Sequence, residues 1–216
     1  ALTDEADRAR DGEDAVAEQG EGEDRLDGGV GDDRLEGGIG DDTYQFSLGG
    51  GFDQIVELSG TGDSNQVVFG PGIDPAGVQY RLGNGLELPI GAQGDGLSLG
   101  FPNFSDIHNS RAVDRFQFAD GTVLTDAQLV DRRINVPGTE DNDFLEGTNA
   151  RDLFAGGLGN DQMNGTAGDD QYSFAVGDGV DTIEDLVKTG QGNSVVFGSG
   201  ITSADLTLGW QAPPFG

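Results

Sequence analysis

Large apolar residues recur at every ninth position in two stretches of the chain, and small or polar residues fill the positions between them. Three units span 19–27, 28–36 and 37–45, and four more span 138–146, 147–155, 156–164 and 165–173. The apolar residue is the eighth of each unit: Leu26, Leu35, Tyr44, Leu145, Phe154, Met163 and Tyr172. One apolar position between two polar neighbours predicts a short strand whose middle side chain points inward. Each unit therefore predicts a three-residue strand after a six-residue turn.

The predicted turns are rich in glycine, and each ends on aspartate. The sixth residues are Asp24, Asp33, Asp42, Asp143, Asp152, Asp161 and Asp170. Glycine permits positive φ, so a turn can direct backbone carbonyls at one centre, to which the aspartate adds a carboxylate. Two units complete one coil, so strands stack in parallel on two sides and each turn lies against the turn two units away. The pattern predicts an all-β fold, a parallel β-roll (a right-handed β-helix or solenoid) with turns filled by calcium, which prefers such oxygen ligands.

Composition strengthens the case for a metal. The 216 residues include 40 acidic and 11 basic ones, for a formal net charge of −29, and only 34% are hydrophobic. Self-repulsion of this size opposes compaction, and scattered acids and glycines would favour disorder. Here they recur at fixed intervals, so several calcium ions are the expected counter-charge. Nucleic acid and anionic membranes are not expected partners, because both are negative.

The repeated unit resembles the RTX (repeats-in-toxin) haemolysin-type calcium-binding nonapeptide, GGxGxDxUx. The resemblance implies that the carbonyls of the second and fourth residues and the carboxylate of the sixth are ligands. In the first block these are Gly20, Gly22, Asp24, Gly29, Gly31, Asp33, Gly38, Gly40 and Asp42. In the second they are Thr139, Asp141, Asp143, Thr148, Ala150, Asp152, Gly157, Gly159, Asp161, Thr166, Gly168 and Asp170. The threonines and Ala150 depart from the glycine consensus, which leaves their turn geometry open.

A longer repeat appears when the chain is compared with itself at an offset of 128 residues. Positions 20–73 and 148–201 share 25 of 54 residues without a gap. Both copies extend the turn pattern by a Gly-x-Gly-x-Asp segment, whose aspartate follows the previous one after eleven residues. We expect one further, slightly looped-out calcium turn in each copy, formed by Gly49, Gly51, Asp53, Gly177, Gly179 and Asp181. Glu57 and Asp185 follow these turns at equivalent positions and are either ligands or surface charges.

Between the blocks, alternating apolar residues predict strands in VQYRL (78–82), LELPI (86–90) and DRFQFADGTVLT (114–125). This stretch is similar to the domain that follows haemolysin-type repeats, and we expect it to continue or cap the stack. A short helix is predicted at 125–129, capped by Thr125 or Asp126. The expected divisions are degenerate repeats (1–18), calcium block 1 (19–57), the associated β domain (58–134), calcium block 2 (135–185) and a truncated second associated domain (186–216).

No enzyme activity is expected. The chain has no cysteine, and its lone histidine, His108, lies in a loop-like segment without a nucleophile and orienting acid. No apolar stretch is long enough to span a bilayer, so membrane insertion is not expected. The first residues lack a cleavable signal pattern, and the resemblance implies type I secretion and an extracellular or cell-surface location.

Three functions fit the pattern. The first is a structural or spacer segment of a secreted bacterial protein that folds on binding calcium outside the cell. The second is a fibre, adhesin or surface-layer protein in which tandem 128-residue modules associate end to end. The third is an accessory C-terminal domain of a secreted enzyme or toxin.

Overall fold

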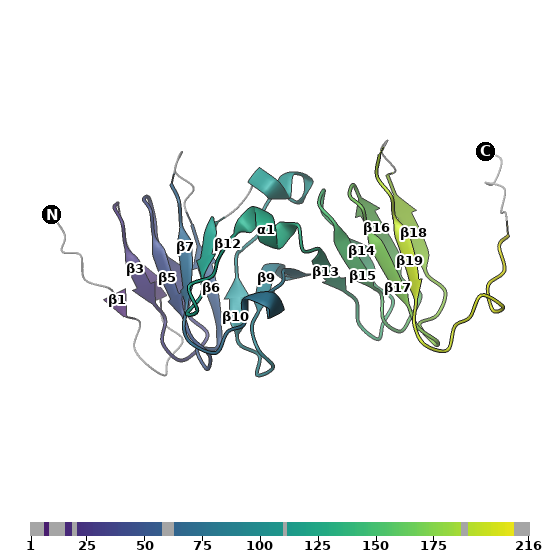
Figure 1. The fold of residues 1–216 in the computed structure, drawn as a ribbon, viewed down its shortest axis with the longest axis horizontal. Coiled ribbons are helices and arrows are strands. Elements are labelled where there is room, and N and C mark those ends of the chain that lie inside the picture. Colours follow the sequence, from purple (N-terminus) through teal and green to yellow (C-terminus); the bar gives the residue numbers. More distant parts are fainter. Residues whose placement is uncertain are drawn as a thin grey trace.

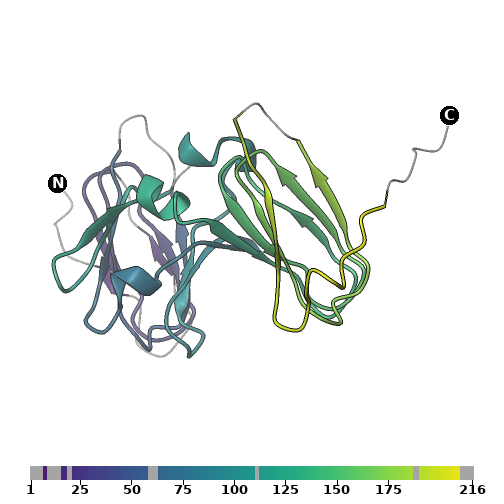
Figure 2. The same cartoon turned by 45° about the vertical axis from the view of Figure 1, so that its right-hand side comes forward.

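Two stacks of short strands lie side by side along the chain's long axis (Figure 1). The structure is a computed structural model that describes residues 7–8, 16–18, 21–57, 63–109, 112–186 and 190–209. For 7–8 and 16–18 it describes the backbone alone. Gly20 and most of the segment 1–18 lie outside the described residues. Figure 2 shows that the strands of each stack run roughly parallel to one another.

The first stack has strands that alternate between two sheets. Its strands are β1 (Asp7–Arg8), β2 (Val16–Glu18), β3 (Arg25–Asp27), β4 (Arg34–Glu36), β5 (Thr43–Phe46), β6 (Phe52–Val56) and β7 (Gln66–Phe69). Sheet A contains β1, β3, β5 and β7, and sheet B contains β2, β4 and β6, in both cases as parallel neighbours. Strand n thus pairs with strand n+2, as the coil of two units predicts.

The eighth residue of each unit lies between the two sheets. In the first block Leu26, Leu35 and Tyr44 are almost completely buried. They align across strands, because Leu26 pairs with Tyr44 in the β3–β5 register and Leu35 pairs with Ile55 in the β4–β6 register. The equivalent side chains of successive coils bury apolar area against one another in a thin core. This burial stabilises the stacking of the coils. The prediction of an inward-facing apolar ladder is confirmed here.

The segment between the blocks is built from η1 (Pro75–Gly77), β8 (Arg81–Gly83), β9 (Gly85–Pro89), β10 (Gly96–Ser98), η2 (Phe104–Asn109), β11 (Arg115–Gln117), β12 (Val123–Thr125) and α1 (Asp126–Val130). In sheet A, β11 adds in parallel to β7, and β12 then pairs antiparallel with β11. In sheet B, β10, β9 and β8 form an antiparallel meander beside β6. The segment therefore ends sheet A and continues sheet B.

Local sequence explains where these elements begin and end. Thr125 caps α1 in a capping box with Gln128, so the predicted short helix is confirmed. Residues 114–125 fold as two strands because Gly121 adopts φ +90° in the Asp120–Gly121 turn between them. The strand predicted at 78–82 begins only at Arg81, since the 3-10 helix η1 precedes it.

The second stack repeats the first on the other side of this segment. Its strands are β13 (Ile134–Pro137), β14 (Phe144–Glu146), β15 (Asp152–Ala155), β16 (Gln162–Thr166), β17 (Gln171–Phe174), β18 (Thr182–Asp185) and β19 (Ser194–Phe197). β13 pairs with β8, so sheet B runs without a break from β2 to β19. β14, β16 and β18 form the opposing three-stranded sheet. Phe154 and Tyr172 stack in the core with ring centroids 5.0 Å apart. Leu145, in the first repeat unit of this block, lies in β14 and is half-buried.

The fold is the predicted all-β parallel β-solenoid. Its departures from parallel pairing are confined to β8–β10 and β11–β12. Sheet B crosses the expected borders at 57/58 and 134/135, so the division into five segments stays a prediction. Among the described residues, no helix has the length and apolar character needed to cross a bilayer.

Candidate metal-binding turns

Turns two units apart lie in direct contact at their fourth residues. A Cβ at Gly40 would collide with the carbonyl oxygen of Gly22, and a Cβ at Gly51 would collide with that of Gly31. The second block repeats this at Gly168 against Ala150 and at Gly179 against Gly159. Glycine at the fourth position thus lets one turn approach the carbonyls of the next. The Gly-x-Gly-x-Asp segments at 49–53 and 177–181 join the same stacks.

The sixth-position aspartates form ladders along the stacks. The backbone N–H of Asp24 donates to Asp42 Oδ1 at 2.8 Å, that of Asp33 to Asp53 Oδ1 at 3.1 Å, and that of Asp42 to Asn65 Oδ1 at 2.9 Å. The second block has the corresponding bonds from Asp143 to Asp161, Asp152 to Asp170, Asp161 to Asp181 and Asp170 to Asn193. One carboxylate oxygen of each acceptor aspartate is therefore used to align the turn before it.

The second carboxylate oxygen of several aspartates has no donor. Asp42, Asp161 and Asp170 are at most 1% exposed, and within the described residues their Oδ2 atoms are buried without a hydrogen-bond partner. A buried carboxylate oxygen without a partner is costly unless a proton or cation satisfies it. These oxygens, together with the stacked carbonyls, fit a hard oxygen-ligated cation such as calcium.

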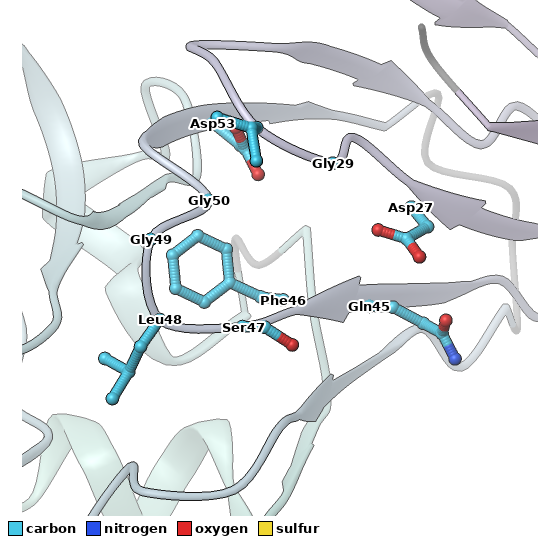
Figure 3. A pocket seen from close by; sticks show the side chains of 10 residues that line it. Asp27, Gly29, Gln45, Phe46, Ser47, Leu48, Gly49, Gly50 and Asp53 are labelled. Atoms are coloured by element: carbon cyan, nitrogen blue, oxygen red, sulfur yellow. The ribbon is translucent and has the colours of Figure 1, made fainter. Parts of the chain in front are cut away.

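A hollow of about 120 Å³ lies between two stacked turns, the ones that join β3 to β4 and β5 to β6. Gly29 of one turn and Gly49, Gly50 and Asp53 of the next line it, and Asp27 lines its other side (Figure 3). The side chains of Asp27 and Asp53 flank the hollow, with the ring of Phe46 beside them (Figure 3). A space of this size is large enough for an ion with one or more waters.

Turns with threonine at the second position are built differently. Thr139 donates to Asp143 Oδ2 from its backbone N–H at 2.6 Å and from its hydroxyl at 2.9 Å. Thr148 does the same to Asp152 Oδ2 at 2.7 and 3.2 Å. In these two turns protein donors occupy the oxygen that is bare in Asp42, Asp161 and Asp170. Thr166 instead keeps the glycine-like conformation with φ +63°.

The structure gathers most of the predicted ligands into the turn stacks. Positive φ occurs at the second- or fourth-position glycines Gly22, Gly29, Gly31, Gly38, Gly40, Gly157, Gly159 and Gly168, and at Gly49, Gly51, Gly177 and Gly179 of the additional turns. Positive φ is not found at Thr139, Asp141, Thr148 and Ala150. The carbonyls of these residues nevertheless lie against the next turn of the stack. Gly20 lies outside the described residues. The role of all these turn residues as metal ligands stays a prediction.

Burial and mutual repulsion raise the pKa values of several turn carboxylates. Burial raises the pKa of Asp53 and Asp152 to about 7 and that of Asp170 to about 6. Repulsion from a neighbouring carboxylate raises each pKa further: Asp33 acts on Asp53, and Asp170 acts on Asp152. Asp185 acts in the same way on Asp170. Burial also raises the pKa of Asp42. The turns therefore favour either protonation or a bound cation at neutral pH.

The periodic pattern missed several polar residues of the stacks. Asn65 and Asn193 occupy the aspartate position in the turn that follows each Gly-x-Gly-x-Asp segment. The carboxyl of Asp114 accepts from the backbone N–H of Asn65 at 3.0 Å and extends that ladder into β11. The shared offset of 128 residues could have identified the two asparagines. Irregular spacing hides Asp114.

Among the described residues, no three histidine, cysteine, aspartate or glutamate side chains gather closely enough to hold a metal on side chains alone. An ion held by the described turns would therefore need further oxygen ligands, such as backbone carbonyls or water. The carbonyls of Gly22, Gly31, Ala150 and Gly159, which lie against the next turn of each stack, are available for this.

Comparison with known families supports this assignment. The family described as RTX calcium-binding nonapeptide repeat (4 copies) matches residues 19–55 and 137–172. The family described as haemolysin-type calcium binding protein related domain matches residues 86–128, within the segment between the stacks. No curated protein matches the chain.

Among solved structures, the extracellular lipase LipA from Serratia marcescens is similar at 18% sequence identity and a TM-score of 0.36. The match covers 84% of this chain and 32% of the lipase chain, so this chain spans about a third of that protein.

Proposed function

From the premise that the chain carries RTX haemolysin-type calcium-binding repeats, we propose that it is a calcium-dependent folding module that acts as a structural spacer in a secreted bacterial protein. One observation carries the proposal: buried turn carboxylates, such as Asp42 and Asp161, present an oxygen without a donor. Without a cation, these charges oppose the fold that surrounds them. With calcium, binding free energy becomes folding free energy.

Secretion follows from the same coupling. A chain of net charge −29 with a thin core is poorly folded at low calcium, which suits passage through an export channel. Outside the cell, millimolar calcium matches the affinity of extracellular calcium modules, roughly 10⁻⁴ to 10⁻³ M. The family similarity supports an extracellular location, which we propose for this chain.

The binding test is equilibrium dialysis of the whole chain against calcium and, separately, magnesium. We expect several calcium ions per chain and weak uptake of magnesium, which demands tight octahedral geometry and keeps its waters. Equal uptake of both ions, or no uptake of calcium, contradicts the proposal.

We propose that the chain has no catalytic activity of its own. The hollow beside His108 is lined by Asp131, Asn149, Arg151 and other residues, none of which is serine, threonine, cysteine, lysine or tyrosine. Among the described residues that line this hollow, none offers a hydroxyl, thiol or amine for the histidine to activate. A turnover that a single substitution in these residues abolishes overturns this statement.

A second candidate function is end-to-end assembly, which one structural contrast favours. In the first copy β11 covers β7, and Val67 and Phe69 are buried. The equivalent residues of β19, Val195 and Phe197, are 47% and 42% exposed, and β19 has no outer partner among the described strands. Such an apolar edge can pair with a later segment of its own chain, as β7 pairs with β11, or with a second copy. Of the described strands, β2 is the one at the other edge of sheet B, where a second copy could extend the same parallel sheet.

Sedimentation of the chain in calcium tests assembly. We expect concentration-dependent oligomers that Val196→Lys on β19 disperses, whereas Phe101→Lys, an exposed apolar residue in a loop, leaves them intact. A monomer at all concentrations in calcium removes this candidate and leaves the spacer role.

A further inference from the structure

Glu57 occupies the place of a turn glycine. β4 and β6 pair with Glu36 opposite Val56, so the next residues, Gly37 and Glu57, lie side by side at the start of successive turns. A side chain at Gly37 would collide with the hydroxyl of Tyr44 and with Asp42 Oδ2. The space left by this glycine therefore holds oxygen atoms. The Tyr44 hydroxyl donates to Glu57 Oε1, which brings the Glu57 carboxylate to the same space.

The second copy builds the same arrangement with aspartate. In the β16–β18 pair Asn164 lies opposite Glu184, which places Asp185 next to Gly165 after a small shift of register. Asp185 Oδ2 lies 2.6 Å and Asp170 Oδ2 2.7 Å from the point where a Cβ of Gly165 would be. The Tyr172 hydroxyl donates to Asp185 Oδ2 at 2.5 Å.

Two carboxylates thus share one interior space in each copy. Asp185 Oδ2 accepts from the Tyr172 hydroxyl and from the Asn193 amide at 2.6 Å, but other carboxylate oxygens there have no donor. Asp42 and Asp170 are 0% exposed, and their Oδ2 atoms lack a hydrogen-bond partner in the described residues. Asp185 Oδ1 is likewise buried without one. Within the part of the chain that the structure describes, Arg133 places a positive charge near Asp170, and its guanidinium donates to the Asp169 carbonyl at 3.3 Å.

The sequence of these turns explains why a carboxylate is needed. The regular turn opens on two small residues, and the carbonyl of the second is one of the ligands that the family resemblance implies. The turns at 57 and 185 open instead on Glu57-Leu58 and Asp185-Leu186, so the glycine pattern is lost. A side-chain carboxylate can take the place of a backbone carbonyl as an oxygen ligand, and it adds a charge, which tightens calcium binding.

We propose that Glu57 and Asp185 are calcium ligands that complete the last cation site of each copy, Glu57 with Asp42 and Asp185 with Asp170. Tyr44 and Tyr172 are positioning residues that donate to one oxygen of the added carboxylate and aim it into the site. This assignment rests on the proposed calcium-dependent function and extends the ligand set beyond the nonapeptides.

The test counts calcium ions in the whole chain and in Glu57→Gln, Asp185→Asn and the double variant. Equilibrium dialysis should show one ion fewer, or one site weakened about tenfold, for each substitution. Terbium emission excited through the tyrosines should fall in parallel, because Tyr44 and Tyr172 contact the proposed ligands. The matched control is Glu184→Gln, which removes the exposed neighbouring charge on β18 and should change neither readout.

A double variant that keeps the full ion count and terbium emission overturns the assignment. If Asp185→Asn loses an ion, Asp185→Glu must restore it; failure of this rescue shows a structural role and also overturns the assignment. A wild-type chain that binds no calcium is a different result, because it refutes the proposed function itself.

Discussion

Asp161 faces two ways: its Oδ1 accepts the backbone N–H of Asp143 at 2.9 Å, and its Oδ2 lies buried without a hydrogen-bond partner among the described residues. One oxygen therefore aligns the neighbouring turn, and the other is available to an ion. Asp143 differs, because the N–H and hydroxyl of Thr139 already occupy its Oδ2.

This difference predicts unequal effects of two identical substitutions. Asp161→Asn should raise the calcium concentration at the folding midpoint about tenfold, since it removes a charged ligand worth about 1–2 kcal/mol. Asp143→Asn should raise it much less. Calcium titrations followed by circular dichroism measure both. Equal shifts would mean that the bare oxygen of Asp161 has no special role.

The threonine turns should be stabilised by their hydroxyls. Thr148→Val removes the hydroxyl that donates to the fully buried Asp152, so we expect a loss of about 1–2 kcal/mol in the free energy of unfolding in calcium. Thr202→Val removes a similar bond to Asp205 in an exposed turn and is the control, with little change expected. Urea unfolding of both variants decides the point, and equal stability losses would contradict it.

Turn stacking should depend on glycine at the fourth position. Gly40 has φ +139°, and a methyl group there would also collide with the Gly22 carbonyl. Gly94 has φ +91°, but no atom lies within 4 Å of its hypothetical Cβ. Gly94→Ala should therefore cost about 1–3 kcal/mol of backbone strain, and Gly40→Ala about 1–3 kcal/mol more from overpacking. Equal costs in chemical unfolding would argue against close stacking.

Protons should compete with calcium. Burial raises the pKa of Asp53 and Asp152 to about 7, above the value near 4 of an unfolded aspartate. A group whose pKa is raised by folding stabilises the fold below its unfolded pKa, and this contribution is lost as the pH rises to the folded value. The free energy of unfolding of the calcium-free chain should thus increase as the pH is lowered from about 7 to about 4.

Calorimetry in buffers of different ionisation enthalpy measures the proton exchange. Calcium binding near pH 6 should release protons, and binding at pH 8.5 should release few. A release that is absent at pH 6 contradicts the raised pKa values.

The repeat pattern was sufficient for the architecture, because a nine-residue period leaves few ways to bury one apolar residue per unit. Leu26, Leu35 and Tyr44 lie where that period places them. The threonine turns were harder to foresee. Thr139 and Thr148 break the glycine consensus, and whether a hydroxyl or a cation satisfies the aspartate depends on side-chain geometry that spacing does not encode.

Contacts between distant segments were also beyond the periodic pattern. The pairing of β8 with β13 joins residues far apart in the sequence and makes sheet B continuous. The meeting of Glu57 with Tyr44 depends on the β4–β6 register, which places Glu57 beside Gly37. Neither relationship follows from counting nine-residue units.

The coupling of calcium to folding is tested most directly by far-ultraviolet circular dichroism of the whole chain, recorded in chelator and then in millimolar calcium. We expect a largely disordered spectrum in chelator at neutral pH and a cooperative gain of β-structure on adding calcium, which magnesium at equal concentration fails to reproduce. A β-rich spectrum in chelator that calcium leaves unchanged would contradict it.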